Sequence, residues 1–387
     1  MPIAVSRAHS LPADHEYFKL FGQAQQRGAS VCVPVTLALQ GGGSRGIWQA
    51  GVLAELLDAD VLSIAAVFGA SAGAINAAAL SVPMTDHTTA LREVWSRLAS
   101  SARDLFPEWR RFPSAIGSLA RRYWKGRNRL RRAPLVSNAT LEDAIARAFP
   151  GAWKAGVNTY VYATELPHAV TKPWDAPPFE FLAPPGATLF RRFNDPKLVP
   201  ESHPLVKVLA ASSCLPIVEP VVTGNASFAD GGVLANIPAG FLQIAGALST
   251  WGFTLFVLPT PPERMSPKCD YIDWKTVELL RAIQRCVATR SSRVFVLASN
   301  APVLPGMLGL VSGFKSEESV GALFEGGRRD ARPFVAALKD FFSNPVPHTP
   351  ALQAFDLVDK VLPELPPEPP KAWWMPWVGY EFARQFE

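Results

Sequence analysis

The stretch from residue 35 to residue 80 constrains the fold most, because strand-like and helix-like patterns alternate there around two glycine-bearing turns. A hydrophobic strand pattern over 31–40 ends in a glycine-rich loop, and a helical apolar pattern follows over 47–57. A second hydrophobic run, 61–68, ends in Gly-Ala-Ser-Ala-Gly and leads into an alanine-rich helical run, 72–80. This order predicts a βαβ unit, and therefore a parallel sheet with a right-handed crossover. Both turns then lie at the carboxyl edge of adjacent strands, where open α/β sheets bind ligands.

The second turn places Ser71 between Gly69 and Gly73. Gly-x-Ser-x-Gly between a strand and a helix is typical of a sharp turn that leaves a nucleophilic hydroxyl free. The unpaired N–H groups at the start of the following helix favour developing negative charge. The pattern also occurs by chance in turns built of small residues, so the motif alone leaves a structural turn open.

The first turn is a glycine-rich loop that opens a helix. It consists of Gly41, Gly42, Gly43, Ser44, Arg45 and Gly46. Glycine N–H groups at a helix start can approach a ligand oxygen closely, so this Gly loop can supply an oxyanion hole, and Arg45 adds a positive charge. Gly41, Gly43 and Gly46 also satisfy the dinucleotide pattern G-x-G-x-x-G. That alternative lacks its acidic residue about twenty positions further on, because the next strand ends at Ser71.

The base for a serine nucleophile is less evident, because none of the six histidines has a sequence context typical of catalysis. A Ser-Asp-His order would need Ser71, Asp230 and His348, and His348 lies in a proline-rich stretch. Asp230 follows an apolar stretch and precedes Gly231 and Gly232, which form a tight turn. A carboxylate can serve as the base if burial raises its pKa toward neutrality. Asp-Gly is also a common turn with no catalytic role.

Three motifs therefore occur in a known order: Gly-Gly-Gly-Ser-Arg-Gly, Gly-Ala-Ser-Ala-Gly and Asp-Gly-Gly. Together they resemble the motifs of the patatin-like phospholipases, which are lipid acyl hydrolases with a Ser-Asp dyad. The resemblance covers about residues 33–260, and one departure is Ile237, where the family often has a second asparagine. Weaker matches lie at 163–166, 211–216 and 230–238.

The resemblance implies an α/β fold of three layers, α/β/α, with a mainly parallel central sheet. It implies hydrolysis of fatty-acyl ester bonds of phospholipids, with Ser71 as nucleophile and Asp230 as base, and it requires no metal and no cofactor. Two alternatives stay open: a non-catalytic membrane-binding scaffold on this fold, and an acyltransferase that uses the same dyad. The other implied site residues are Gly41, Gly42, Gly43 and Arg45 at the oxyanion hole, Gly69 and Gly73 at the elbow, and Gly231 and Gly232 after the base.

We expect three regions along the chain. Residues 1–30 form an N-terminal arm, irregular or a short helix, and residues 31–345 form the catalytic domain. Residues 346–387 form a Pro/Trp-rich C-terminal tail, which either packs on the domain or anchors at a membrane. Near the end of the catalytic domain, 320–342 has a helical pattern that the glycine pair at 326–327 could break.

An insertion at about 101–135 alternates arginine and lysine with tryptophan, tyrosine and phenylalanine. It predicts either a solvated basic face or a segment that binds anionic lipid headgroups. The net charge of +5 fits an anionic surface, and no nucleic-acid module accompanies it, so we expect a phospholipid membrane as partner and no nucleic acid. A protein activator stays open. The four cysteines are scattered, and neither a signal peptide nor a transmembrane run is evident, so we expect a cytoplasmic protein with peripheral membrane association.

Overall fold

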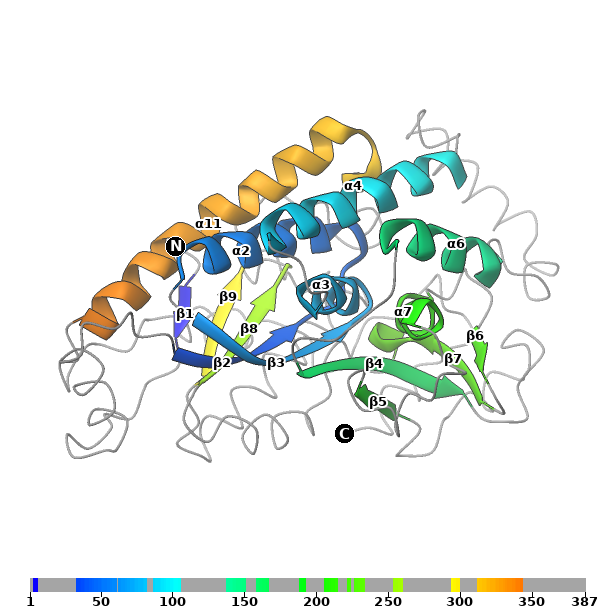
Figure 1. The fold of residues 1–387 in the computed structure, drawn as a ribbon, viewed down its shortest axis with the longest axis horizontal. Coiled ribbons are helices and arrows are strands. Elements are labelled where there is room, and N and C mark those ends of the chain that lie inside the picture. Colours follow the sequence, from blue (N-terminus) through cyan, green and yellow to red (C-terminus); the bar gives the residue numbers. More distant parts are fainter. Residues whose placement is uncertain are drawn as a thin grey trace, which may run out of the picture.

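The computed structural model describes thirteen stretches of the chain, and these form one mixed sheet with helices packed on it (Figure 1). The described residues are 3–5, 33–60, 62–81, 86–105, 137–150, 158–166, 188–192, 205–214, 221–223, 226–233, 253–259, 294–299 and 312–343.

The centre of the sheet is parallel. Its strands in spatial order are β9 (Val294–Ala298), β8 (Phe253–Leu258), β2 (Val33–Leu39), β3 (Leu62–Ala70) and β4 (Asn158–Leu166). Helix α2 (Gly46–Asp58) joins β2 to β3, so the expected βαβ unit is present. The central strands are rich in consecutive apolar residues, as expected of strands buried on both faces. The predicted α/β class, with a mainly parallel sheet flanked by helices, is confirmed.

The edges of the sheet are antiparallel. On one side β1 (Ile3–Val5) pairs with β9, although the sequence predicts an irregular arm or short helix for this stretch. On the other side β5 (Thr188–Arg192) and β7 (Ala226–Asp230) pair with β4, and β6 (Val221–Thr223) pairs with β7. Strands of three to five residues are too short for a periodic signal, and their pairing depends on distant partners.

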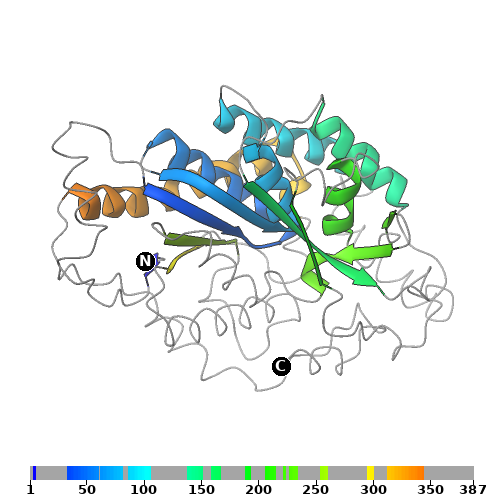
Figure 2. The same cartoon turned by 60° about the horizontal axis from the view of Figure 1, so that its bottom comes forward.

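The described helices lie on one face of the sheet, as Figures 1 and 2 show. Besides α2 they are α3 (Ala72–Ser81), α4 (His87–Leu105), α6 (Asn138–Ala148), α7 (Leu205–Ser213) and α11 (Glu317–Ser343). The helix that the sequence pattern predicts at 274–289 lies outside the described residues.

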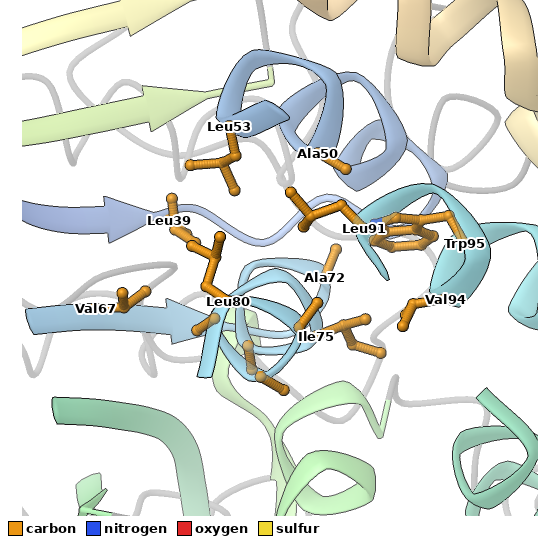
Figure 3. Close-up of a cluster of buried hydrophobic side chains, with 14 of the residues drawn as sticks. Leu39, Ala50, Leu53, Val67, Ala72, Ile75, Leu80, Leu91, Val94 and Trp95 are labelled. Atoms are coloured by element: carbon orange, nitrogen blue, oxygen red, sulfur yellow. The ribbon is translucent and has the colours of Figure 1, made fainter. Parts of the chain in front are cut away.

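The main core lies between the sheet and this helix layer (Figure 3). Leu39 of β2, Leu53 of α2 and Leu80 of α3 point toward one another, and Leu91 and Trp95 of α4 close the cluster. Each such buried side chain contributes about 1.5–3 kcal/mol relative to exposure. All ten residues of α3 are buried, and its alanines leave room for the helix to lie directly against its neighbours.

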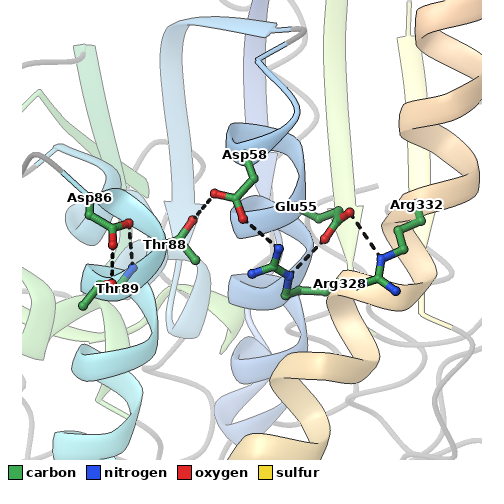
Figure 4. Close-up of polar contacts among 7 residues, drawn as sticks. All are labelled: Glu55, Asp58, Asp86, Thr88, Thr89, Arg328 and Arg332. Atoms are coloured by element: carbon green, nitrogen blue, oxygen red, sulfur yellow. Dashed lines mark hydrogen bonds and ion pairs between the residues drawn. The ribbon is translucent and has the colours of Figure 1, made fainter.

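The predicted helix over 320–342 is present as part of α11, which packs along α2 and is not broken at Gly326 and Gly327. The reason is the partner helix: a methyl group at Gly327 would lie 2.9 Å from the carbonyl carbon of Trp48. Gly51 of α2 has the same relation to Phe324, at 2.8 Å from its carbonyl carbon. These glycines let the two helix backbones touch. Figure 4 shows the polar contacts at the end of this seam, where Arg328 and Arg332 of α11 meet acidic residues of α2.

The predicted tail, 346–387, and residues 106–135 of the basic-aromatic insertion lie outside the described residues. The predicted domain boundaries therefore stay predictions. Within the part of the chain that the structure describes, no helix combines the length and the apolar character needed to cross a bilayer.

Candidate active site

Ser71 lies at the junction of β3 and α3 with φ of 53°, in the left-handed region that residues other than glycine rarely adopt. Such a conformation is strained and persists only where the surrounding structure enforces it. The residue is 6% exposed. A strained serine between a strand and a helix is the geometry that the Gly-x-Ser-x-Gly pattern predicts.

The two flanking glycines are required by close backbone contacts. A methyl group at Gly69 would lie 2.6 Å from the amide nitrogen of Ala74, and one at Gly73 would lie 2.6 Å from the carbonyl carbon of Leu39. Real Cβ atoms do not approach backbone this closely. The turn can therefore form only with glycine at both positions.

Strand register brings Asp230 to the level of Ser71. Ala70, the last residue of β3, pairs with Tyr162, and β4 continues past it to Leu166. Strand β7 pairs antiparallel with residues 163–166 of β4, the part that extends past Tyr162. Its last residue, Asp230, therefore lies opposite Ala163. The antiparallel strand β7 thus ends beside the carboxyl end of the parallel strand β3.

Asp230 is 2% exposed, and its carboxylate lies near the Ser71 side chain. Its Oδ1 accepts a hydrogen bond from the Gly232 N–H at 2.6 Å. Burial raises the pKa of Asp230 to about 6, although the contacts with Ser71 and Gly232 lower it. At neutral pH the group is therefore mostly ionised yet able to accept a proton. The structure places the predicted nucleophile and the predicted base together, and their catalytic roles stay predictions.

The end of α7 holds both residues, which the sequence did not reveal. The Ser71 N–H donates to Ser212 Oγ at 2.9 Å, and the Ser212 hydroxyl donates to the Tyr162 carbonyl at 2.6 Å. The Asp230 N–H donates to the Cys214 carbonyl at 2.9 Å. The sequence motif at 211–216 contains Ser212 but gives it no role, because its partners are 141 and 50 positions away.

The Gly loop turns tightly between β2 and α2. Gly43 has φ of 56°, a conformation that favours glycine, and the Arg45 N–H donates to the Gly42 carbonyl at 3.0 Å. Within the described residues, no acceptor takes the N–H groups of Gly42 or Gly43. Arg45, predicted to add charge here, is 2% exposed, and Gly41 is buried as well. The loop can thus offer two amides to an oxyanion.

The Gly loop lies against the serine turn at the same sheet edge. A methyl group at Gly46 would lie 2.7 Å from the Ala72 Cβ. On its other side the loop is tied to the turn before α11, because Ser44 Oγ accepts a hydrogen bond from the Gly313 N–H at 2.9 Å. Gly231 packs close to Tyr162 and Ala70. All of the predicted site residues therefore gather at this edge.

Histidines and metal ligands add little to the site within the described residues. His87, at the start of α4, is the one histidine in that part of the chain, and His348 lies outside it. The described residues contain no group of three or more His, Cys, Asp or Glu side chains placed to hold a metal ion.

Comparison with known proteins gives one family and several structural likenesses. The family model for Patatin-like phospholipase matches residues 37–242, more than half of the 387-residue chain, and this range contains all three motifs. The chain is similar to VipD from Legionella pneumophila at 14% identity and a TM-score of 0.36. That alignment covers 78% of this chain and 66% of VipD, just under two thirds of its length. No curated protein matches the sequence.

Proposed function

This chain belongs to the patatin-like phospholipase family, and we propose that it hydrolyses fatty-acyl ester bonds of phospholipids with Ser71 as nucleophile and Asp230 as base. The observation that carries the proposal is the buried Asp230 carboxylate within reach of a strained serine. A pKa of about 6 suits a base that works near neutral pH.

In the acylation step, Ser71 Oγ bonds to the ester carbonyl carbon while Asp230 takes the hydroxyl proton. The carbonyl electron pair moves onto its oxygen, which becomes an oxyanion. When the tetrahedral intermediate collapses, the bond to the alcohol oxygen breaks and this oxygen takes the proton from Asp230. Lysolipid leaves, and the acyl group stays on Ser71.

In the deacylation step, Asp230 takes a proton from a water molecule whose oxygen attacks the acyl carbon. Collapse of the second intermediate breaks the bond to Ser71 Oγ, which recovers the proton. Fatty acid leaves, and both residues return to their starting states. A carboxylate in direct reach of the serine makes a histidine relay unnecessary in this scheme.

The oxyanion is held by the Gly loop in both steps. The N–H groups of Gly42 and Gly43 have no other acceptor within the described residues, and they lie beside the serine turn. Losing one such donor typically costs 10²–10³-fold in rate, on the order of 3 kcal/mol. The N-terminus of α3 adds a favourable dipole at the same place.

The substrate is presented at a membrane surface in this proposal. The support is the sequence of the insertion at about 101–135, where basic and aromatic residues alternate. Reversing the charges of Arg121, Arg122 and Lys125 should weaken binding to vesicles that contain anionic lipid, more at low than at high salt. Equal binding of this variant and the wild type would remove the membrane part of the proposal.

The test of the reaction is fatty-acid release from mixed phospholipid vesicles by the full chain. Ser71→Ala and Asp230→Asn should reduce release to background. The matched control is Ser213→Ala, which removes a hydroxyl next to Ser212 and should keep wild-type release. A folded wild type that releases no acid from vesicles or simple acyl esters, even with cell extract added as a source of activator, would overturn the proposal. Appearance of the acyl group on an acceptor other than water would make the chain a transferase.

A further inference from the structure

Three polar side chains from three helices meet beneath the Gly loop. Trp95 of α4 is 2% exposed, and Asn76 of α3 and Gln49 of α2 are 0% exposed. Trp95 Nε1 donates to Asn76 Oδ1 at 2.6 Å. Asn76 Nδ2 donates to Gln49 Oε1 at 2.9 Å and to the Gly46 carbonyl at 2.9 Å. None of the three has a role in the reaction steps above.

The chain of hydrogen bonds ends on backbone carbonyls at the carboxyl edge of the sheet. Gln49 Nε2 donates to the Val257 carbonyl at 2.7 Å and to the Gln40 carbonyl at 3.2 Å. Val257 belongs to β8, and Gln40 follows the last residue of β2. One side chain thus joins the ends of two neighbouring strands.

The direction of this chain is fixed by its two ends. An indole N–H can only donate, and a backbone carbonyl can only accept. Asn76 must therefore turn its oxygen to Trp95, and Gln49 must turn its oxygen to Asn76. Both amide groups then use every N–H they have. A flip of either amide would leave buried donors facing donors, at a cost of about 1–3 kcal/mol for each unsatisfied group.

The carbonyls of Gln40 and Gly46, which accept these hydrogen bonds, lie on either side of the residues predicted to form the oxyanion hole. Gln40 precedes Gly41, and Gly46 follows Arg45. In a planar trans peptide the carbonyl and the next N–H point in opposite directions. Because the Gln40 carbonyl points toward Gln49, the Gly41 N–H points away from it. The chain of amides thus sets which way the loop backbone faces.

We propose that Trp95, Asn76 and Gln49 are positioning residues that hold the Gly loop so that the backbone amides of Gly42 and Gly43 face the oxyanion. They act through the backbone and touch neither the substrate nor the reacting atoms. The catalytic consequence rests on the proposed hydrolase function, whereas the effect on the loop backbone does not.

Two variants break the chain at different points. Asn76→Asp keeps the shape but places an oxygen against the Gly46 carbonyl and Gln49 Oε1, so two hydrogen bonds become repulsive contacts. Trp95→Phe removes the single donor that starts the chain. The matched control is Trp48→Phe, because Trp48 is also buried and its indole donates to Asp330 of α11 at 2.9 Å, away from the loop.

The first readout is hydrogen–deuterium exchange of the backbone amides of residues 40–46 in the full chain. Exchange should be about 10-fold faster in Trp95→Phe and Asn76→Asp than in Trp48→Phe, because the loop opens more often. If these amides exchange no faster in the two variants than in Trp48→Phe, the proposal is overturned. If Asn76→Asp does not fold, the comparison of Trp95→Phe with Trp48→Phe alone tests the proposal.

The second readout is ester hydrolysis. In both variants kcat should fall about 10- to 100-fold with KM within about twofold, since the loop amides bind the transition state more tightly than the ground state. An unchanged kcat in variants with a mobile loop would contradict the catalytic consequence. A wild type without turnover would overturn the hydrolase function alone, and the exchange comparison would still decide the positioning role.

Discussion

Helix α2 makes polar contacts of opposite kinds at its two ends. Near its start, Gln49 is fully buried and joins neutral groups in a chain of directional hydrogen bonds. Near its end, Glu55 and Asp58 form ion pairs with Arg328 at 3.0 Å and 2.7 Å (Figure 4). The side chain of Glu55 is 17% exposed, that of Asp58 45% and that of Arg328 23%, so water reaches these ion pairs.

The difference follows from what each end has to do. Neutral amides can be buried without the large desolvation cost of a charge, and they fix orientation because donors and acceptors are not interchangeable. Water-accessible ion pairs tolerate rearrangement and contribute little to stability. At the Gly loop the orientation of the backbone amides matters. Where α2 packs on α11, the contact at the glycines already sets the distance between the two helices.

The largest effect is expected at the one buried charge that the proposed reaction uses. Asp230→Asn should lower kcat by about 10³-fold or more, because the serine loses its base. A Ser213→Ala control should keep the wild-type kcat. Measurable turnover of Asp230→Asn within about tenfold of wild type would mean that another group is the base.

The same substitution should stabilise the fold above pH 6. The folded-state pKa of Asp230 is about 6, above the ordinary value of 3.8, so the folded protein holds this proton more tightly than the unfolded chain does. Its contribution to stability is therefore most favourable below pH 3.8 and is lost as the pH rises to about 6. At pH 8 the ionised group costs up to about 3 kcal/mol, which Asn avoids. Urea unfolding at pH 5 and pH 8 should show a larger gain at pH 8, and a gain confined to pH 5 would contradict this sign.

The next largest effect is expected on stability, from substitutions in the contact between α2 and α11. Packing rather than charge determines this effect. Gly327→Ala forces a methyl group against the Trp48 backbone and should destabilise the fold by about 1–3 kcal/mol. Its neighbour is the control: Gly326 has no atom closer than 3.8 Å to an added methyl group, so Gly326→Ala should be neutral or stabilising by up to about 1 kcal/mol. Thermal unfolding of the two variants decides, and equal melting temperatures would show that the backbones do not need to touch.

The smallest effect is expected at the ion pairs. Arg328→Met keeps most of the aliphatic stem but removes the contacts to Glu55 and Asp58, and it should cost about 0.5–1 kcal/mol, less in high salt. Denaturant unfolding at two salt concentrations measures this. If the free energy of unfolding falls by more than about 3 kcal/mol, and by the same amount at both salt concentrations, these charges form a buried network. The two ends of α2 would then not differ in the way described.

The sequence predicted the parts of the site that are local. Ser71, Gly69, Gly73 and the Gly loop lie in one contiguous βαβ stretch, so alternation of patterns and glycine placement were enough. The apolar stretch before Asp230 and the two glycines after it made Asp230 a candidate base, but only the register of β7 on β4 shows that it lies near Ser71.

The features that sequence reasoning missed depend on distant partners. Ser212 is one serine among several until Ser71 and Tyr162 are placed beside it. The pair Gly326–Gly327 suggested a helix break, and only the backbone of α2 explains why α11 continues. The strands of three to five residues at the sheet edges carry no period of their own.

The most direct test of the account is the rate at which a fluorophosphonate labels Ser71 as a function of pH, in the wild type and in Asp230→Asn. If buried Asp230 is the base of the serine, the wild-type rate rises through a midpoint near pH 6 and then levels off, and Asp230→Asn is slow at every pH. Equal labelling rates in the two proteins, with the same pH midpoint, would contradict the Ser71–Asp230 dyad.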